Sequence, residues 1–177
     1  MQRLLIAALI AAILLFPGMA CSQSGIDIKG WNKAEWGMAE SDLLNIYKDT
    51  LIKSDKRQYL DGDELYTDMK IPGLKIDGAT FDVFFEMGSK DNTLKRVRLT
   101  KYYSASALDF TQFEKLLTSK YGSPSYKEEE KQGKSVASWL LPYTKIDLEY
   151  IYSAYDGKVL DILYADRGFT SKNNDKL

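Results

Sequence analysis

Few residues in this chain could carry out chemistry, because its 177 residues include no histidine and only one cysteine. The absence of histidine removes acid–base catalysis by imidazole, Ser-His-Asp and Cys-His nucleophiles, and every histidine metal site. A lone cysteine can form no intrachain disulfide, cysteine-rich zinc site or iron–sulfur cluster. We therefore expect no metal and no cofactor.

Carboxylates are the remaining candidates for catalysis. Asp147 and Glu149 stand two residues apart in an alternating segment, which places both on one strand face. Such a pair could act in a glycosidase, but this spacing is also the commonest pattern of a solvated sheet face. The acidic turn 61–64 begins like a calcium loop, but Leu65 and Tyr66 stand where a ligand and a glycine are needed. We predict that the protein is not an enzyme.

The single cysteine, Cys21, follows directly on a hydrophobic leader. Leu4–Phe16 is an uninterrupted apolar run that Pro17 and Gly18 end. This run is shorter than the roughly 20 apolar residues of a membrane-spanning helix, and it fits a signal peptide over residues 1–20. Because an unpaired thiol is a liability in an oxidising compartment, the position of Cys21 favours lipidation.

Residues 18–21, Gly-Met-Ala-Cys, resemble the lipobox of bacterial lipoproteins, in which lipid is added to the cysteine thiol and to the new amine. Gly18 departs from the lipobox, where Leu is usual. Gly18 and Ala20 also fit an ordinary signal-peptidase site, which leaves a soluble periplasmic or secreted protein as the alternative. By the same resemblance, Ser22 in place of Asp implies sorting to the outer membrane. We expect a bacterial envelope protein that faces the periplasm and is anchored through lipid on Cys21.

The composition is that of a folded domain rather than a nucleic-acid binder. The formal net charge is -1, with 28% charged and 45% hydrophobic residues. Nucleic-acid binding needs a strongly basic face, so we expect no nucleic-acid partner. The basic strip Lys95–Arg98 is most simply the wet face of a strand, although contact with anionic lipid near the anchor remains an alternative.

Two segments have the periodicity of helices. Leu43, Leu44, Tyr47 and Leu51 share one face of a helix over about residues 39–53. The second helix is expected to begin at Asp109, with Gln112 completing a capping box, and to end at Gly122 and Pro124. Its apolar stripe comprises Phe110, Phe113, Leu117 and Tyr121.

Most of the remaining chain alternates as antiparallel strands with one packed and one wet face. Residues 80–87 place Phe81, Val83, Phe85 and Met87 on one face, and residues 94–102 place Val97 and Leu99 inward. Segments 135–141, 144–152 and 158–165 alternate in the same way. Asp77-Gly78 and Asp156-Gly157 are hairpin signals.

These elements predict an α+β fold, a two-layer structure in which two helices pack on an antiparallel sheet. The order helix, strands, helix, strands also raises the hypothesis of two similar α–β halves. We divide the chain into a signal peptide (1–20), a flexible tether (21–30), one domain (31–168) and a disordered tail (169–177).

Several passages resemble those of a family of small bacterial secreted proteins and lipoproteins of uncharacterised function. They are WGMAESDLLNIY (36–47), FEKLLTSKYGSPSYKEE (113–129) and the later pattern of Trp139, Ile146, Leu148 and Tyr150. The arrangement, over about residues 31–166, is more distantly similar to the helix-plus-sheet modules of the beta-lactamase-inhibitor-like fold and of the small lipoprotein of the outer-membrane barrel-assembly machinery. This resemblance implies protein–protein contact and supplies no catalytic residue. The Gly-x-Thr helix opening of the assembly lipoprotein is missing here, so its role is not carried over.

Aromatic residues are the candidate contacts for a partner or ligand. Trp31 and Trp36 precede the first helix, where they either close the core or form an exposed edge for a partner. Tyrosines gather in and beside the last two strands, where core packing is the alternative to an exposed patch. They are Tyr143, Tyr150, Tyr152, Tyr155 and Tyr164.

From the sequence we hypothesise an envelope lipoprotein that serves as a non-enzymatic protein-interaction module, with a membrane and an envelope protein as its partners. The alternative is a periplasmic binding module for a peptide, a glycan or a small ligand, which would use a tyrosine-rich sheet face.

Overall fold

The computed structural model describes residues 28–131, 133–153 and 157–169. Its helices and strands follow one another along these residues, and a single helical turn at 167–169 comes after the last strand. They are β1 (Gly30–Trp31), β2 (Ala34–Glu35), α1 (Glu40–Ile46), β3 (Ile52–Leu60), β4 (Leu65–Ile76), β5 (Ala79–Gly88), β6 (Leu94–Lys101), α2 (Ala107–Tyr121), β7 (Tyr126–Lys131), β8 (Lys134–Leu140), β9 (Thr144–Ser153) and β10 (Gly157–Asp166).

Eight of the strands form one antiparallel sheet in the order β3-β4-β5-β6-β10-β9-β8-β7. The strands β3 to β6 form one meander and β7 to β10 form another. The last strands of the two meanders, β6 and β10, pair at the centre of the sheet. Both edges carry polar strands, since β3 is charged and almost fully exposed and β7 is rich in Glu and Lys. Charged edge strands discourage edge-to-edge association.

The sequence-based fold class was wrong. The described residues are mostly antiparallel β structure, with an eight-stranded sheet and a small two-stranded β1–β2 ribbon, rather than a balanced α+β fold. The main cause is the segment that follows residue 46. Its hydrophobic spacing predicted a helix to residue 53, but the helix ends at Ile46 and β3 begins at Ile52. Because β3 is an exposed edge strand, it lacks the alternating apolar residues that would reveal it.

The boundaries of α2 also needed correction at one end. Ser106, rather than Asp109, is the N-cap, and its hydroxyl accepts a hydrogen bond from the backbone N–H of Asp109. The Asp109 carboxylate in turn accepts from the backbone N–H of Ser106, which completes a capping box shifted by three residues. At the other end Gly122 is the C-cap, as predicted, with φ +86°.

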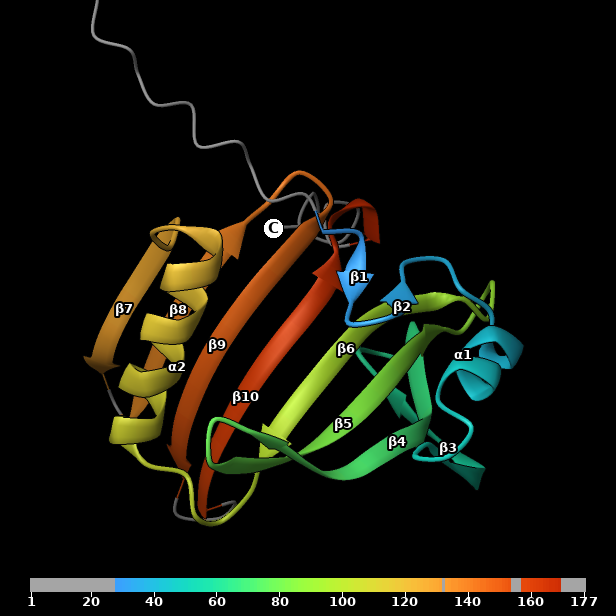
Figure 1. Cartoon of the computed structure of the whole chain (residues 1–177), viewed down its shortest axis with the longest axis horizontal. Coiled ribbons are helices and arrows are strands. Elements are labelled where there is room, and N and C mark those ends of the chain that lie inside the picture. The colour runs from blue at the N-terminus through green and yellow to red at the C-terminus, as the bar shows by residue number, and fades with distance from the viewer. Residues whose placement is uncertain (1–27, 132, 154–156, 170–177) are drawn as a thin grey trace, which may run out of the picture.

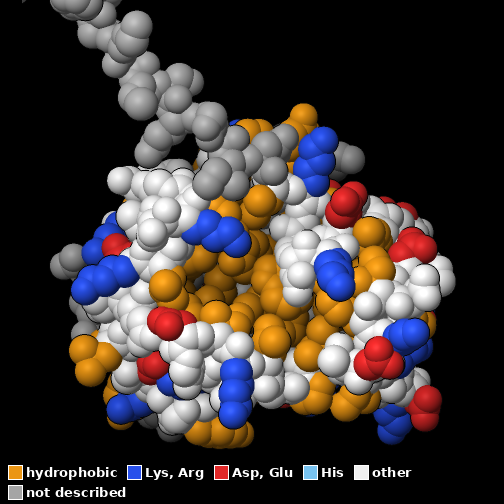
Figure 2. Space-filling model, viewed as in Figure 1, with side chains coloured by type: hydrophobic (Ala, Val, Ile, Leu, Met, Phe, Trp, Pro, Cys, Tyr) orange, Lys and Arg blue, Asp and Glu red, His pale blue; other side chains and the backbone are white. Residues whose placement is uncertain are grey.

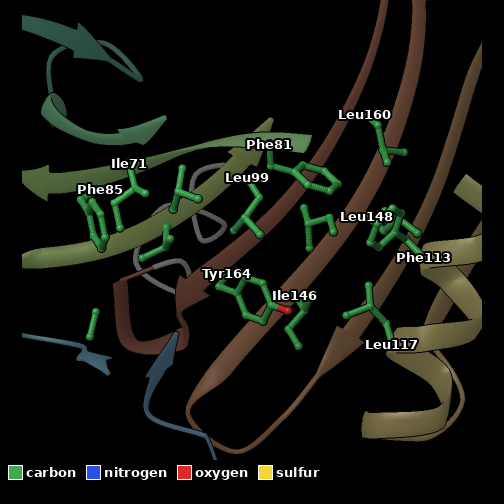
Figure 3. Packing of buried hydrophobic residues seen from close by; sticks show 14 of the residues in the cluster. Ile71, Phe81, Phe85, Leu99, Phe113, Leu117, Ile146, Leu148, Leu160 and Tyr164 are labelled. Carbon is green, nitrogen blue, oxygen red and sulfur yellow. The ribbon is translucent and has the colours of Figure 1, made fainter. Parts of the chain in front are cut away.

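The core lies on one face of the sheet, which we call the inner face (Figure 1). Helix α2 lies across β8 and β9 on this face, and the β1–β2 ribbon and α1 lie over the other half. Figure 3 shows buried side chains of β5, β6, β9 and β10 on this face, with Leu148 and Ile146 lying near Phe113 and Leu117 of α2. The expected inward residues Phe81, Val83, Phe85, Met87, Val97 and Leu99 are all buried.

Three contacts help to fix α2 to the sheet. The indole Nε1 of Trp139 on β8 donates a hydrogen bond of 2.8 Å to the carbonyl of Gly122. In the N-terminal half of the helix, the side-chain amide of Gln112 donates to Asp77 in the β4–β5 turn. The ring of Phe113 packs edge-on against Phe81, with centroids 5.1 Å apart. The helix is therefore held along its whole length. Because side chains alternate along each strand, the polar side chains of the strands point to the opposite face of the sheet.

Among the described residues, none of the helices has the length and apolar composition required to span a bilayer.

Candidate functional site

Alternation along the central strands builds a polar surface on the face opposite the core, which we call the outer face. In β10, Leu160 and Ile162 are buried in the core, so Asp161 between them points outward. In β9, Ile146 and Leu148 are buried in the same way, and Asp147 points outward. The outer face is therefore fixed by the same pattern that fixes the core.

Strand register determines which of these outward side chains are neighbours. Asp161 on β10 lies directly opposite Glu149 on β9 and opposite Thr100 on β6. Directly opposed residues on a sheet face have Cβ atoms roughly 5 Å apart. Asp161 therefore stands beside a second carboxylate on one side and beside a hydroxyl on the other.

The outer face is hollowed into a groove of about 590 Å³ that runs from the β3–β4 turn across to β7. We call it the outer groove. Its lining residues are Asp61, Arg96, Arg98, Tyr126, Glu128, Lys134, Val136, Ser138, Lys145, Asp147, Glu149, Asp161 and Leu163.

A buried ion-pair cluster forms one end of the outer groove. Glu86 on β5 is fully buried, and Nε of Arg96 lies 2.5 Å from its Oε2. Nε of Arg98 donates to the other carboxylate oxygen of Glu86 at 2.7 Å. Arg96 also pairs with Asp61 in the β3–β4 turn, at 2.6 Å. Because Glu86 is held by two guanidinium groups, both arginines are fixed in place and have their charges compensated.

Two lysines occupy the other end of the outer groove, and each already has a carboxylate partner. Lys134 forms a salt bridge with Glu149, and Lys145 lies 3.0 Å from Asp147. The hydroxyl of Ser138 donates to Asp147 at 2.6 Å. The two carboxylates considered above as a catalytic pair are thus both engaged in ion pairs on the outer face.

Asp161 differs from every other carboxylate of the groove. Its Oδ1 is buried and has no hydrogen-bond partner. Burial raises the pKa of Asp161, the hydroxyl of Thr100 and the charge of Arg98 oppose the shift, and the nearby carboxylates Glu149 and Glu86 add to it. A buried carboxylate oxygen without a donor is costly, so this position favours an incoming hydrogen-bond donor, above all a cationic one.

The predicted tryptophan contacts are packed against the core. The Trp31 ring meets Phe85 edge-on, with centroids 6.3 Å apart. The Trp36 indole donates a hydrogen bond of 2.9 Å to the hydroxyl of Thr144, which itself donates to the carbonyl of Ile28 at 2.6 Å. Both are only partly buried, but the first contact attaches the N-terminal segment to β5 and the others attach it to the start of β9.

The predicted tyrosines do not come together in one patch. Tyr150 and Tyr164 are buried on the inner face. Tyr143 and Tyr152 are exposed, but Tyr143 directly precedes β9 and Tyr152 lies near its other end. Tyr155 and the lipidation candidate Cys21 lie outside the described residues. Among the residues that the structure describes, no three metal-ligating side chains gather.

Sequence reasoning missed the residues that define the groove. The basic strip Lys95–Arg98 was interpreted as solvated, whereas Arg96 and Arg98 compensate a buried glutamate. Asp161 received no attention, although a lone acid between two buried strand residues was visible in the sequence.

Comparison of the chain with protein-family models, with curated proteins and with solved structures finds no match.

Proposed function

We propose that this protein is a non-enzymatic interaction domain of the bacterial envelope, anchored through Cys21, and that it binds a protein partner by accepting a basic side chain into the outer groove. The observation that carries the proposal is the buried and unpartnered Oδ1 of Asp161.

The charge of the outer groove supports a cationic ligand. Its lining carries five carboxylates and four cations, and the buried Glu86 beneath them adds a sixth carboxylate. Each of the four cations has at least one carboxylate partner within the groove or beneath it. Among the described residues, neither Asp161 nor Glu128 is hydrogen-bonded to a lining cation, but Glu128 accepts a hydrogen bond from the Tyr126 hydroxyl, whereas Oδ1 of Asp161 is buried without a donor. An ammonium or guanidinium group would provide both the charge and the missing donor.

The shape of the groove supports a side chain on a protein rather than a free ion. Val136 and Leu163 contribute apolar surface beside Asp161, and Tyr126 stands half-exposed at the β7 end. The aliphatic stems of Lys and Arg pack well on such surface while the charged head reaches an acid. Tyrosine and arginine are also frequent hot spots of protein interfaces.

A basic probe peptide tests this proposal without knowledge of the partner. We would titrate a short arginine-containing peptide into the isotopically labelled protein and follow the backbone amides by NMR. We expect shifts concentrated around Asp161, Glu149 and Val136, which Asp161→Asn abolishes. Asp166→Asn, on the same strand but outside the groove lining, is the matched control and should leave them unchanged. Shifts scattered over the surface, or the same shifts in Asp161→Asn, would refute the proposal.

A further inference from the structure

A second pocket lies on the inner face, between the β1–β2 ribbon and the C-terminal end of α2. Its volume is about 450 Å³. Its apolar walls are Ile28, Trp31, Ala34, Tyr121 and Tyr164. Figure 2 shows hydrophobic side chains exposed in a hollow between these two elements. We call this the inner pocket; it does not share a lining residue with the outer groove.

The inner pocket leads toward the hydrophobic core. Tyr164 belongs both to the pocket lining and to the buried cluster, and in Figure 3 it lies beside Ile146, with Leu117 of α2 beyond. Burial raises the pKa of the Tyr164 hydroxyl above its ordinary value, and Tyr121 adds to the shift. The rings of Trp31, Tyr121 and Tyr164 therefore give one side of the pocket an aromatic surface against which a hydrocarbon chain can pack, while Lys29, Asn32, Glu35 and Lys120 make the rest of its lining polar.

The rim of the inner pocket carries two lysines whose charges are not compensated by carboxylates. Lys29 lies over the ring of Tyr143, with Nζ 4.7 Å from the centroid. Lys120 lies over the ring of Tyr121, at 5.1 Å. Both lysines are exposed, and neither forms a salt bridge within the described part of the chain. Glu35 is the one acidic residue in the pocket lining, so the rim favours an anionic head group.

We infer that the inner pocket binds an anionic amphiphile with a single alkyl chain, namely a long-chain fatty carboxylate. The chain would contact Trp31, Tyr121 and Tyr164, and the carboxylate would pair with Lys29 and Lys120 at the rim. The volume lies within the range of about 300–1,000 Å³ that is typical of small-molecule sites. This inference is independent of the proposed function, because the two sites are on opposite faces of the sheet.

Quenching of tryptophan fluorescence by doxyl-labelled stearate tests the inference, because Trp31 lines the pocket. We would use the full chain with Cys21→Ser, so that no attached lipid competes with the probe. We expect saturable quenching in the parent protein. The apparent affinity should fall about tenfold in the double variant Lys29→Glu/Lys120→Glu, which is the size expected for loss of two exposed charge contacts. The labelled stearate methyl ester should bind as weakly to the parent protein as the acid does to the double variant.

The matched control is Lys48→Glu/Lys75→Glu, which changes the net charge equally at exposed positions away from the pocket. It should leave quenching unchanged. Three results would overturn the inference: no saturable quenching in the parent protein, equal weakening in the two double variants, or equal binding of the acid and the ester.

Discussion

Asp161 of β10 lies directly opposite Glu149 of β9 on the outer face, and Lys134 forms its salt bridge with Glu149. Two acids therefore stand side by side, and Lys134 forms a salt bridge with only one of them, Glu149. The other acid, Asp161, is the one whose Oδ1 is buried without a donor. A binding site is expected to contain such a group, because it lowers the stability of the free domain and can be paired by a donor on a ligand.

The first prediction is that Asp161→Asn stabilises the free protein at neutral pH. Because the pKa of Asp161 is raised in the folded state, the folded protein holds this proton more tightly than the unfolded chain. Stability therefore falls as pH rises from the unfolded pKa through the folded pKa, and the penalty is complete above that window. If Asp161→Asn removes a penalty of about 1 kcal/mol, the Tm should rise by about 2–4 °C.

Thermal unfolding of both proteins from pH 3 to pH 8 measures this effect. The difference in Tm between the two proteins should increase as pH rises and should disappear in acid. A lower Tm for Asp161→Asn at neutral pH would show that the charge is stabilising, contrary to this account.

The second prediction concerns the ion pairs beneath the groove. Arg98→Met leaves the buried Glu86 with Arg96 as its one guanidinium partner. Loss of a partner of a buried charge costs about 3–5 kcal/mol, and we expect the low end because Arg96 remains. Adding Glu86→Gln should restore part of the stability. In the control Lys70→Met, loss of the exposed pair with Asp82 should cost less than about 1 kcal/mol. Urea unfolding that gives equal losses for Arg98→Met and Lys70→Met would contradict the buried cluster.

The third prediction is that Ser106→Ala lowers stability by about 1 kcal/mol, because it removes the N-cap of α2. Thr111→Ala, in the exposed middle of the same helix, should change stability by less than half as much as the cap variant. Denaturant midpoints for the two variants provide the comparison. If the order were reversed, the capping box would not be the contact that holds the helix start.

The carboxylate of Asp109 in the same capping box should make the stability of the protein depend on pH in the acid range. Burial alone would raise its pKa, but hydrogen bonds from Lys101 and Ser106 hold the pKa of Asp109 below its ordinary value. Its contribution to stability is present above the unfolded pKa and is lost as pH falls through the folded pKa. Ser106→Ala should therefore lose less stability than the parent protein between pH 5 and pH 2.

The fourth prediction concerns the anchor. We expect the protein purified from membranes to have an intact mass above that of residues 21–177, by the mass of acyl groups on Cys21 and its amine. Cys21→Ser should move the protein to the soluble fraction or leave the leader uncleaved. A mass equal to the bare 21–177 chain would exclude the lipid anchor.

Much of the sheet could be predicted from the sequence, because a strand buried on one face has apolar residues at every second position. The alternation of Phe81, Val83 and Phe85 identified β5, and the Asp77-Gly78 turn located its start. The exposed edge strand β3 could not be found this way, since neither of its faces is buried. The short β1–β2 ribbon was also missed, because two-residue strands carry no periodicity.

The outer groove was only partly predictable. The alternation along β9 and β10 predicts that Glu149 and Asp161 each face away from the core, but their register does not follow from the sequence: a two-residue turn at Asp156-Gly157 would place Tyr152 opposite Asp161, whereas Gly157 is itself paired with Ser153 and Asp161 with Glu149. The neighbours Thr100 and Arg98 could not have been placed, because they depend on the pairing of β10 with β6 across the centre of the sheet. Such pairing between distant segments leaves no local signal.

The most direct test of the central claim is photocrosslinking in living cells from Tyr126, which is 53% exposed and lines the outer groove. Its replacement by benzoylphenylalanine would be compared with the same replacement of Tyr59, which is equally exposed at 53% but does not line the groove. We predict one recurrent adduct from position 126, absent from position 59, lost in Asp161→Asn and kept in Asp166→Asn. The same adducts from both positions, or an adduct that persists in Asp161→Asn, would contradict the claim that the groove binds a partner through this acid.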